Sequence, residues 1–301
     1  MTAVFVEDGV DKGAIWHFGE PNKEQKALEA GTAWADLSHL NVIAVSGADR
    51  LKWLHDLTTQ HLSELGAGQW TSALILDAQG HVEYQFNLVD DGDTTWLVID
   101  PGYIDTLVAY LQKMKFMLRV DVRDASNEFA VLRAPGAETD LGGPFALVPR
   151  AELKEMQETF GATAMQVGTW ALDAMRVAAG RPRIAFETDH KSIPNELGVL
   201  NKSVHMNKGC YRGQETVAKI FNLGNPPRRL VLLHLDGSQV VMPAPGTPVM
   251  NGEIQVGFLG TVARHFELGP IALAIVKRTT PVDAQLTVEN VAASQQVIVP
   301  A

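Results

Sequence analysis

The residues most suited to chemistry lie in the run Lys-Gly-Cys-Tyr-Arg-Gly-Gln-Glu that begins at Lys208. Cys210 stands between Lys208 and Arg212, two cations that would stabilise a thiolate. Gly209 and Gly213 permit backbone conformations closed to other residues, as a main chain needs where it approaches a ligand. The pattern predicts a reactive or redox-responsive thiol on a ligand-facing turn. The alternative is a structural cysteine between two turn glycines, since free cysteines are usually inert core residues.

The rest of this run consists of Tyr211, Gln214 and Glu215, followed by Thr216. An acidic residue is favourable in the first turn of a helix. Glu215 with Thr216 is therefore expected to begin a helix or to anchor the loop.

Length and composition predict a folded protein of two or three domains. The chain has 301 residues, of which 46% are hydrophobic and 20% are charged, and this is the usual range for globular proteins. The 25 basic and 35 acidic side chains give a net charge of −10. Such a balance argues against a broad basic surface for nucleic acid, so no direct nucleic-acid binding is expected.

A single cysteine limits the classes of site that the chain can build. An internal disulfide, a zinc finger and an iron–sulfur cluster held by several thiolates of this chain are all excluded, so we expect no metal bound by this chain alone. The N-terminus turns acidic where a signal peptide would be apolar, and no apolar run approaches the roughly 20 residues of a membrane helix. The expected location is the cytoplasm, with no membrane association.

Residues 41–124 are expected to alternate between strands and helices. Leu51, Leu54 and Leu57 mark one helical face, and the strand 81–89 alternates apolar and polar residues as a half-buried hairpin strand does. The expected order is strand, helix, three strands, helix, strand, which is a ferredoxin-like unit with an extra strand. Its predicted elements are 41–46, a helix opened by 47–49, 71–77, 81–89, 95–100, a helix from Ile104 to Met114, and 119–124.

The sequence pattern changes twice in the second half of the chain. Helices are expected at 151–160 and 170–179, and the long irregular stretch 180–201 is of the kind that is more often functional than decorative. Short β runs follow the Gly-Asn-Pro-Pro turn at 224–227 and predict a small β-barrel or sandwich. These runs are 229–235, 247–250, 254–263, 271–277 and 286–288.

The run from Lys208 to Glu215 resembles the signature of the YgfZ family, a branch of the superfamily that includes the aminomethyltransferase T-protein of the glycine cleavage system. Weaker resemblances extend over most of the chain, roughly 30–290. They lie in Asp36–Leu40, Val45–Asp49, Leu54–Thr59, Ala174–Val177 with Gly180, Asp189 with Ile193–Glu196, Arg228–Leu230 and Val256–Ala274.

The resemblance implies an α+β fold: a three-domain cloverleaf around a central channel that holds tetrahydrofolate or a one-carbon derivative of it. Two domains would be ferredoxin-like and the third a β-barrel. The expected division is a folate-binding region, 1–227, and a C-terminal barrel domain, 228–301. Within the first region one ferredoxin-like subdomain is approximately 41–124 and the other is discontinuous.

Departures from the superfamily pattern indicate the branch. The acidic residue that assists aminomethyl transfer falls at Tyr84 or Gln85, neither of which is a carboxylate. Glu83 is one residue away, and a one-residue slip in a strand faces the opposite side of the sheet. The acidic folate contact of the middle helix block falls at Ala178.

The resemblance therefore implies an accessory protein in iron–sulfur cluster assembly or repair, with indirect effects on tRNA modification. Its partners would be folate and iron–sulfur carrier or client proteins. The alternative is a folate-dependent aminomethyltransferase or demethylase, and whether the chain is an enzyme stays open.

Candidate folate contacts complete the predicted site. Glu187 and Asp189 carry acceptors that suit the N–H groups of a pterin, with a solvated charged loop as the alternative. Arg228 could pair with the folate glutamate tail, or it could be an ordinary linker charge. Tyr84 could stack on the pterin, although alternation in a hairpin already explains it, and Arg176 lies in the middle helix block.

Overall fold

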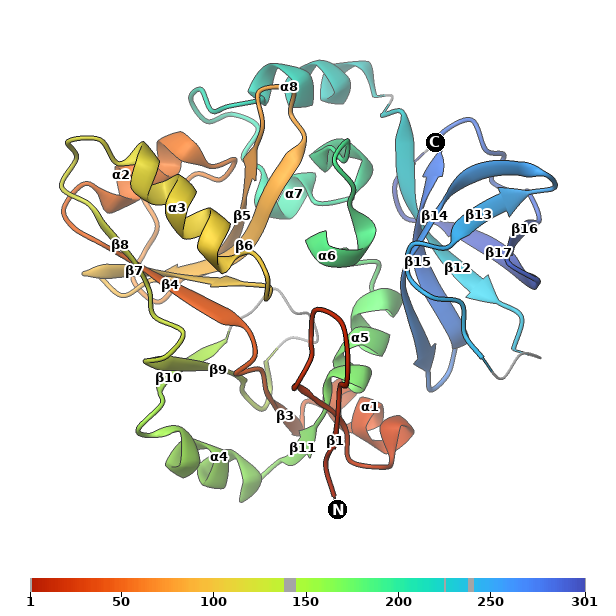
Figure 1. Ribbon diagram of the computed structural model, residues 1–301, viewed down its shortest axis with the longest axis horizontal. Coiled ribbons are helices and arrows are strands. Elements are labelled where there is room, and N and C mark those ends of the chain that lie inside the picture. Colours follow the sequence, from red (N-terminus) through yellow and green to blue (C-terminus); the bar gives the residue numbers. More distant parts are fainter. Residues whose placement is uncertain (1, 138–144, 225, 238–240, 301) are drawn as a thin grey trace. The chain divides into compact units, whose positions relative to one another are not determined.

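The computed structural model describes residues 2–137, 145–224, 226–237 and 241–300 (Figure 1). The chain divides into two compact units that interleave along the sequence. Unit 1 comprises residues 1–75, 84–172 and 202–212, and unit 2 comprises residues 76–83, 173–201 and 213–301. Among the described residues, no helix is both long enough and apolar enough to cross a membrane.

A five-stranded sheet lies mainly in unit 1, and it confirms the element order expected for 41–124. Its strand order is β5-β6-β7-β4-β8, and the pairings β6–β7, β4–β7 and β4–β8 are antiparallel. The tip of the β5–β6 hairpin, residues 76–83, belongs to unit 2. The elements are β4 (Asn41–Ser46), α2 (Arg50–Leu57), β5 (Trp70–Leu76), β6 (Val82–Asp90), β7 (Thr94–Ile99), α3 (Ile104–Met114) and β8 (Asp121–Asp124).

The period of two in these strands decides which face is buried. Alternate residues of the strands, such as Phe86 and Leu88 of β6, pack in one core with Leu54 of α2 and with Leu107 and Leu111 of α3. Both helices therefore cover the same face of the sheet, since residues two apart on a strand point to the same side.

A second sheet lies in unit 1, in the order β10-β9-β3-β11. Helix α4 confirms the helix expected at 151–160, and its Phe160 packs with Trp34 and Leu132 of the sheet. The elements of this region are β1 (Val4–Phe5), β2 (Ile15–His17), α1 (Pro21–Glu29), β3 (Ala33–Asp36), β9 (Phe129–Arg133), β10 (Ala146–Pro149), α4 (Leu153–Gly161) and β11 (Met165–Val167).

The middle of the chain holds short helical turns between longer helices. Helix α5 (Thr169–Ala178) confirms the helix expected at 170–179. The stretch 180–201 contains only α6 (Ile184–Glu187), the 3-10 turn η1 (Pro194–Glu196) and the start of α7 (Leu200–Ser203), which fits its irregular sequence. Glu215 lies in the first turn of helix α8 (Gln214–Leu223). This confirms the expectation that Glu215 begins a helix, which was one of the two alternatives for that residue.

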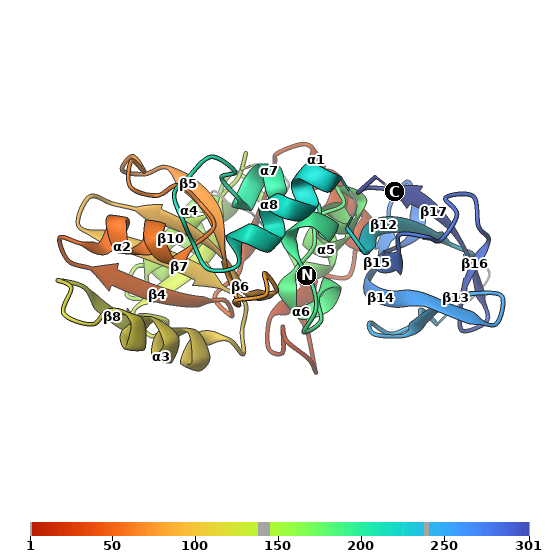
Figure 2. The same ribbon diagram turned by 90° about the horizontal axis from the view of Figure 1, so that it is seen from above.

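The C-terminal strands of unit 2 close into a six-stranded barrel in the order β12-β15-β14-β13-β16-β17 (Figure 2). Closure confirms the barrel rather than the sandwich, and it depends on a strand that the sequence did not predict, β17. That strand buries Val291 and Ala293 but carries polar residues beyond them, so its apolar signal is short. The strands are β12 (Arg228–Leu235), β13 (Pro248–Asn251), β14 (Ile254–His265), β15 (Gly269–Lys277), β16 (Leu286–Val288) and β17 (Val291–Val297).

The expected boundary near 225–228 falls where the chain passes from helix α8 to strand β12. Asn225, part of the predicted turn, lies outside the described residues. The fold is α+β with a closed barrel, as expected. The assignment of domains to 1–227 and 228–301 stays a prediction.

Candidate functional site

Lys208 is a buried structural cation of unit 1, with only 7% of its surface exposed. Its ammonium donates hydrogen bonds to the carbonyl oxygens of His55, Thr58 (2.6 Å) and Gln60 (3.0 Å), at and just beyond the C-terminal end of α2. A cation suits this place because the last carbonyls of a helix lack partners within it and carry partial negative charge. Burial lowers the pKa of Lys208 to about 8, against the pull of Asp56, so the side chain is still mainly protonated at neutral pH.

Further hydrogen bonds fasten the chain on the N-terminal side of Lys208. The Thr59 hydroxyl donates to the Ser203 carbonyl (2.5 Å), and the His205 N–H donates to the Thr59 carbonyl (2.9 Å). The Gln60 side-chain amide donates to the Lys202 carbonyl at 2.8 Å. The segment 202–212 is therefore held against the loop that follows α2.

Cys210 is exposed between two anchored residues. Tyr211 is only 8% exposed, and burial raises the pKa of its phenol to about 12. The Lys208 ammonium lies 5.2 Å from the centre of the Tyr211 ring, within the range of a cation–π contact. Arg212 is exposed as well. The structure thus presents the thiol to solvent on a fixed piece of backbone, while the charge of Lys208 is directed at carbonyl oxygens.

The two glycines of the run have different structural requirements. Gly213 has a φ of +81°, and a Cβ there would lie 2.6 Å from the Asp77 carbonyl oxygen and 2.8 Å from the Gly80 Cα. Gly80, at φ +90°, would bring its own Cβ to 2.9 Å from Cβ of Thr216 on α8. A Cβ at Gly209 would meet nothing within 4 Å. Within unit 2, the hairpin tip and the start of α8 therefore touch backbone to backbone, and only Gly213 of the two motif glycines is needed for that packing.

A charged network in unit 2 joins Asp189 and Arg228, two of the predicted folate contacts. The Arg228 guanidinium donates to both oxygens of Asp189 (2.6 and 2.9 Å) and to both oxygens of Glu196 (2.6 and 3.1 Å). Its Nη2 also lies 3.3 Å from the Ser192 hydroxyl. Such bidentate geometry suits the planar fork of arginine.

The two carboxylates of this network differ in accessibility and in pKa. The Asp189 side chain is 33% exposed, whereas that of Glu196 is fully buried. Burial acts to raise the pKa of Asp189, but hydrogen bonds from Arg228 outweigh it, so the pKa lies below its usual value. Burial raises the pKa of Glu196, against the opposing hydrogen bonds from Arg228. Asp189 is the carboxylate that a ligand can reach.

The network is continuous with the hairpin tip and α8 through the loop 189–196. The Val82 N–H donates to the Ser192 carbonyl at 2.8 Å, and the buried Asn195 donates through Nδ2 to the Val217 carbonyl of α8 at 3.2 Å. The Asn195 Oδ1 has no hydrogen-bond partner in the part of the chain that the structure describes. Asn195 and Glu196 belong to the segment Ile193–Glu196 that resembles the superfamily, but nothing in the sequence predicted that they would be buried.

Arg176 and Glu187, two further predicted folate contacts, form a second and fully buried network in unit 2. Glu187 accepts hydrogen bonds from the N–H of Thr261 (2.6 Å) and of Arg183 (2.7 Å), and it pairs with Arg176 at 3.4 Å. Arg176 also donates to the Thr261 hydroxyl at 2.6 Å. Neither side chain is more than 1% exposed. This network ties α5 and α6 to β14, and its use in folate binding stays a prediction that would require these donors and acceptors to exchange partners.

Tyr84 lies on β6 in unit 1, on the face covered by the helices. It packs against the core there, with its ring centre 6.1 Å from that of Tyr110. The hairpin alternation explains this placement. Stacking of Tyr84 on a pterin stays a prediction.

A cluster of three histidines in unit 1 had no signal in the sequence. The ring centres of His55 and His61 are 4.7 Å apart, and those of His61 and His205 are 5.1 Å apart. Burial, followed by the charge of Lys208, lowers the pKa of His55. Among the described residues, no three His, Cys, Asp or Glu side chains are arranged to hold a metal ion.

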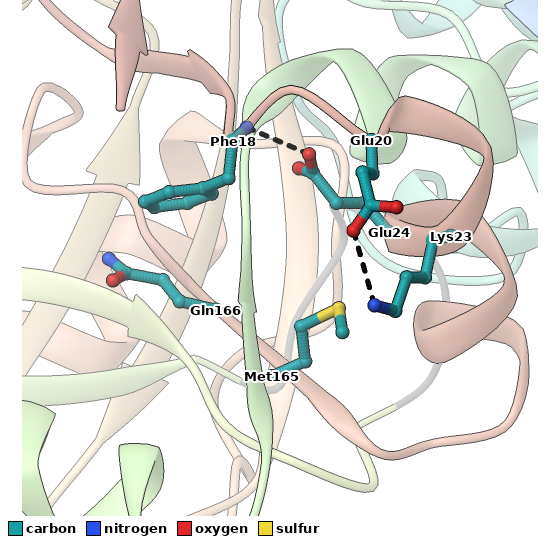
Figure 3. Close-up of a pocket in the computed structure, with 6 residues that line it drawn as sticks. All are labelled: Phe18, Glu20, Lys23, Glu24, Met165 and Gln166. Atoms are coloured by element: carbon teal, nitrogen blue, oxygen red, sulfur yellow. Dashed lines mark hydrogen bonds and ion pairs between the residues drawn. The ribbon is translucent and has the colours of Figure 1, made fainter. Parts of the chain in front are cut away.

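A separate hollow of about 400 Å³ opens in unit 1 between α1 and β11 (Figure 3). Its polar groups are largely paired, since the Glu24 carboxylate accepts from the N–H groups of Phe18 (2.8 Å) and Gly168 (2.9 Å), and Lys23 pairs with Glu20. The lining residues are Phe18, Glu20, Lys23, Glu24, Met165 and Gln166. None of these is a predicted site residue.

Comparisons with known proteins find one matching family model and several similar proteins. Residues 3–140 match the family model described as the GCVT N-terminal domain. The chain is 26% identical to the tRNA-modifying protein YgfZ of Cronobacter sakazakii, over 69% of this chain and 73% of that protein. It is 24% identical to the mitochondrial iron–sulfur cluster assembly factor IBA57 homolog of Mycosarcoma maydis, over 72% of this chain but only 61% of that protein.

A solved structure shares the fold. Aminomethyltransferase T of the glycine cleavage system from Bartonella henselae superposes with a TM-score of 0.80 at 15% identity, covering 98% of this chain and 92% of that one. At that identity the likeness establishes the fold and no more.

The two motif glycines give a matched pair of substitutions. We expect Gly213→Ala to lower the free energy of unfolding by about 3 kcal/mol, because its Cβ meets backbone atoms at a positive φ. Gly209→Ala is expected to change it by less than about 0.5 kcal/mol. Urea unfolding followed by circular dichroism measures both. Equal effects of the two substitutions would contradict this account of the hairpin contact.

The Arg228 network predicts a stability difference that depends on pH. Arg228→Met is expected to cost about 3 kcal/mol at pH 7, because it leaves Glu196 buried without its partner. Without Arg228 both carboxyls bind protons more readily in the folded state, so the deficit is expected to shrink as the pH falls towards 4. Urea unfolding at both pH values tests this.

The matched control is Lys52→Met, which breaks the exposed pair with Asp56. It should change the free energy of unfolding by less than about 0.5 kcal/mol at either pH. A deficit for Arg228→Met that is the same at pH 7 and pH 4 would refute the role given to the carboxylates.

Proposed function

We propose that this chain, a YgfZ-type member of the superfamily of the glycine cleavage T-protein, is a tetrahydrofolate-binding accessory protein. It supports the assembly or repair of iron–sulfur clusters and, through enzymes that carry such clusters, tRNA modification. The names of the YgfZ and IBA57 relatives support this role. It acts in the cytoplasm on cluster carriers or client proteins, without binding nucleic acid directly.

The presentation of Cys210 is the observation that carries the proposal. The thiol is exposed, while Lys208 and Tyr211 on either side of it are buried and anchored. A thiol needed only for packing would lie inside the core. The Cys210 thiol is instead exposed on a fixed backbone, where a partner can reach it. Cys210 is therefore the residue that meets a cluster, a carrier protein or a one-carbon adduct.

The folate part of the proposal is supported by the donors and acceptors of unit 2. A pterin presents amino and ring N–H groups, and the partly exposed, ionised carboxylate of Asp189 suits them. Arg228 would receive the glutamate tail only by exchanging Asp189 or Glu196, its present partners. Glu187 and Arg176 are buried, so they would hold the neighbouring elements of the site in place without contacting the folate directly.

The domain arrangement belongs to the same proposal. Two ferredoxin-like domains within 1–227, one of them 41–124, and the barrel domain 228–301 would surround a channel for tetrahydrofolate or a one-carbon derivative of it. The likeness of the whole chain to aminomethyltransferase T supports this arrangement.

A folate-dependent aminomethyltransferase or demethylase is the second candidate, and the relatives named aminomethyltransferase favour it. Such an enzyme needs a carboxylate at the folate nitrogen. The resemblance aligns that carboxylate with Tyr84 or Gln85 on β6, neither of which is acidic. Glu83 lies on the side of the strand opposite Tyr84, which is the side that Gln85 shares. Glu187 is fully buried, which leaves the partly exposed Asp189 as the candidate carboxylate, although it already accepts hydrogen bonds from Arg228.

Cys210→Ala separates folate binding from cluster support. We expect the variant to bind tetrahydrofolate with a Kd within about threefold of the unchanged protein, a difference of less than about 0.7 kcal/mol. In cells that lack their own YgfZ-type protein, it should leave a cluster-dependent enzyme as inactive as it is without any complementing protein. Calorimetric titration and the enzyme assay measure the two effects. Full complementation by Cys210→Ala would rule out the thiol mechanism.

A direct assay separates the accessory role from the transferase. Incubating the full chain with tetrahydrofolate and an aminomethyl donor, whose carbon is already at the oxidation level of formaldehyde, should yield no methylene-tetrahydrofolate above a protein-free control. Turnover that is lost in Asp189→Asn would instead establish the enzyme and refute the accessory role as the whole function.

A further inference from the structure

The turn between α3 and β8 (Figure 1) contains three consecutive apolar residues. Phe116 is 79% exposed, Met117 is 98% exposed and Leu118 is 46% exposed. Single exposed apolar residues are ordinary, but a contiguous group marks a contact surface or an aggregation hazard. We call these three residues the apolar turn.

The apolar turn is held in place on both sides. The Leu118 N–H donates to the Lys115 carbonyl and the Val120 N–H donates to the Leu118 carbonyl, both at 2.9 Å. The Trp53 indole donates to the carbonyl of Met114 at 3.1 Å, at the point where α3 ends.

Asp49 anchors the other end of the turn. Its carboxylate accepts from the Arg119 main-chain N–H (2.9 Å) and from its guanidinium (2.7 and 3.1 Å). Gly47 makes room, because a Cβ there would lie 2.1 Å from the Arg119 carbonyl oxygen. The exposed side chains are thus displayed by a fixed backbone and do not belong to a loose loop.

The backbone of the turn is strained at Phe116. Its φ is +45°, in the left-handed region that a bulky residue rarely occupies, and where glycine or asparagine would be more stable. A large apolar residue at a strained and solvent-exposed position does not contribute to the stability of the folded state. Strain of this kind is characteristic of functional positions.

The local charge is opposite to that of the whole chain. Residues 106–121 contain the cations Lys113, Lys115 and Arg119 and one acidic residue, Asp121, whereas the chain as a whole carries −10. Arg119 pairs with Asp49, and the Lys115 ammonium lies 3.8 Å from Asp121. Cations near the end of α3 also suit the helix dipole. That accounts for Lys113 but leaves the three apolar side chains unexplained.

We propose that the apolar turn is a docking site for a protein partner that offers an apolar pocket rimmed by carboxylates. Met117 and Phe116 would enter the pocket, since flexible methionine and rigid aromatic side chains are common anchors at interfaces. Lys113 and Lys115 would face the carboxylate rim and fix the orientation. The net negative charge of the chain disfavours the other candidate surface, an anionic membrane.

A photo-crosslinking amino acid placed at position 117 of the full chain, in cells that express it, identifies the occupant. The control carries the same amino acid at position 254, where Ile254 on β14 is 67% exposed but belongs to unit 2. We expect a protein adduct at 117 that is missing at 254, with the crosslinked peptide apolar and flanked by acidic residues. The absence of any adduct specific to 117 would overturn the proposal, as would an adduct with a second copy of this chain.

Binding with the purified crosslinked protein decides whether the contact is specific. Met117→Asp should weaken it by about tenfold or more, and Lys113→Glu with Lys115→Glu should weaken it and reduce its dependence on salt. Ile254→Asp should leave it unchanged, and circular dichroism should show all variants folded. Unaltered affinity in Met117→Asp would refute the proposal. So would Met117-dependent sedimentation of the chain with vesicles of phosphatidylethanolamine and phosphatidylglycerol.

Discussion

The hydrogen bonds of the buried Lys208 ammonium are the interaction that fixes the backbone around the exposed Cys210. Removing a charged amine from water is costly unless its hydrogen bonds are replaced. Here three backbone carbonyls that follow the last turns of α2 replace them. Those carbonyls have no partner within the helix, so one side chain satisfies both sides at once. The consequence is that the backbone at Cys210 is fixed by residues 150 positions away in the sequence.

Unit 2 likewise combines a buried, hydrogen-bonded residue with a neighbouring residue that is partly exposed to solvent. Arg228 binds both Glu196 in the interior and Asp189, which is partly in solvent. Because Glu196 is fully buried, its pKa is raised despite Arg228, whereas the pKa of Asp189 is lowered. Gly213 and Gly80 let the hairpin tip and α8 approach without side chains between them. In both units an exposed or partly exposed group, Cys210 or Asp189, lies next to a buried residue that fixes its position. This arrangement favours binding and presentation over a mobile catalytic loop.

The apolar turn differs from these sites because no described residue of unit 1 covers it. Its hydrogen bonds and the Asp49–Arg119 pair hold the backbone, yet the side chains gain no burial in return. A contact with another molecule would supply that burial. The accessory role proposed above would require such contacts, and the turn and the exposed thiol are two features of unit 1 that a carrier or client would recognise.

The sequence by itself determined the elements of 41–124, the C-terminal β texture and the motif around Cys210. The reason is that period, turn residues and a rare local run are properties of neighbouring positions. It could not show that Lys208 would serve α2 instead of the thiol, that Gly209 is dispensable where Gly213 is not, or that β17 closes the barrel. It also gave Glu187 and Asp189 the same role, although one is enclosed and the other is accessible. Each of these outcomes depends on which distant groups come within hydrogen-bond distance or exclude a Cβ, and only the tertiary structure decides that.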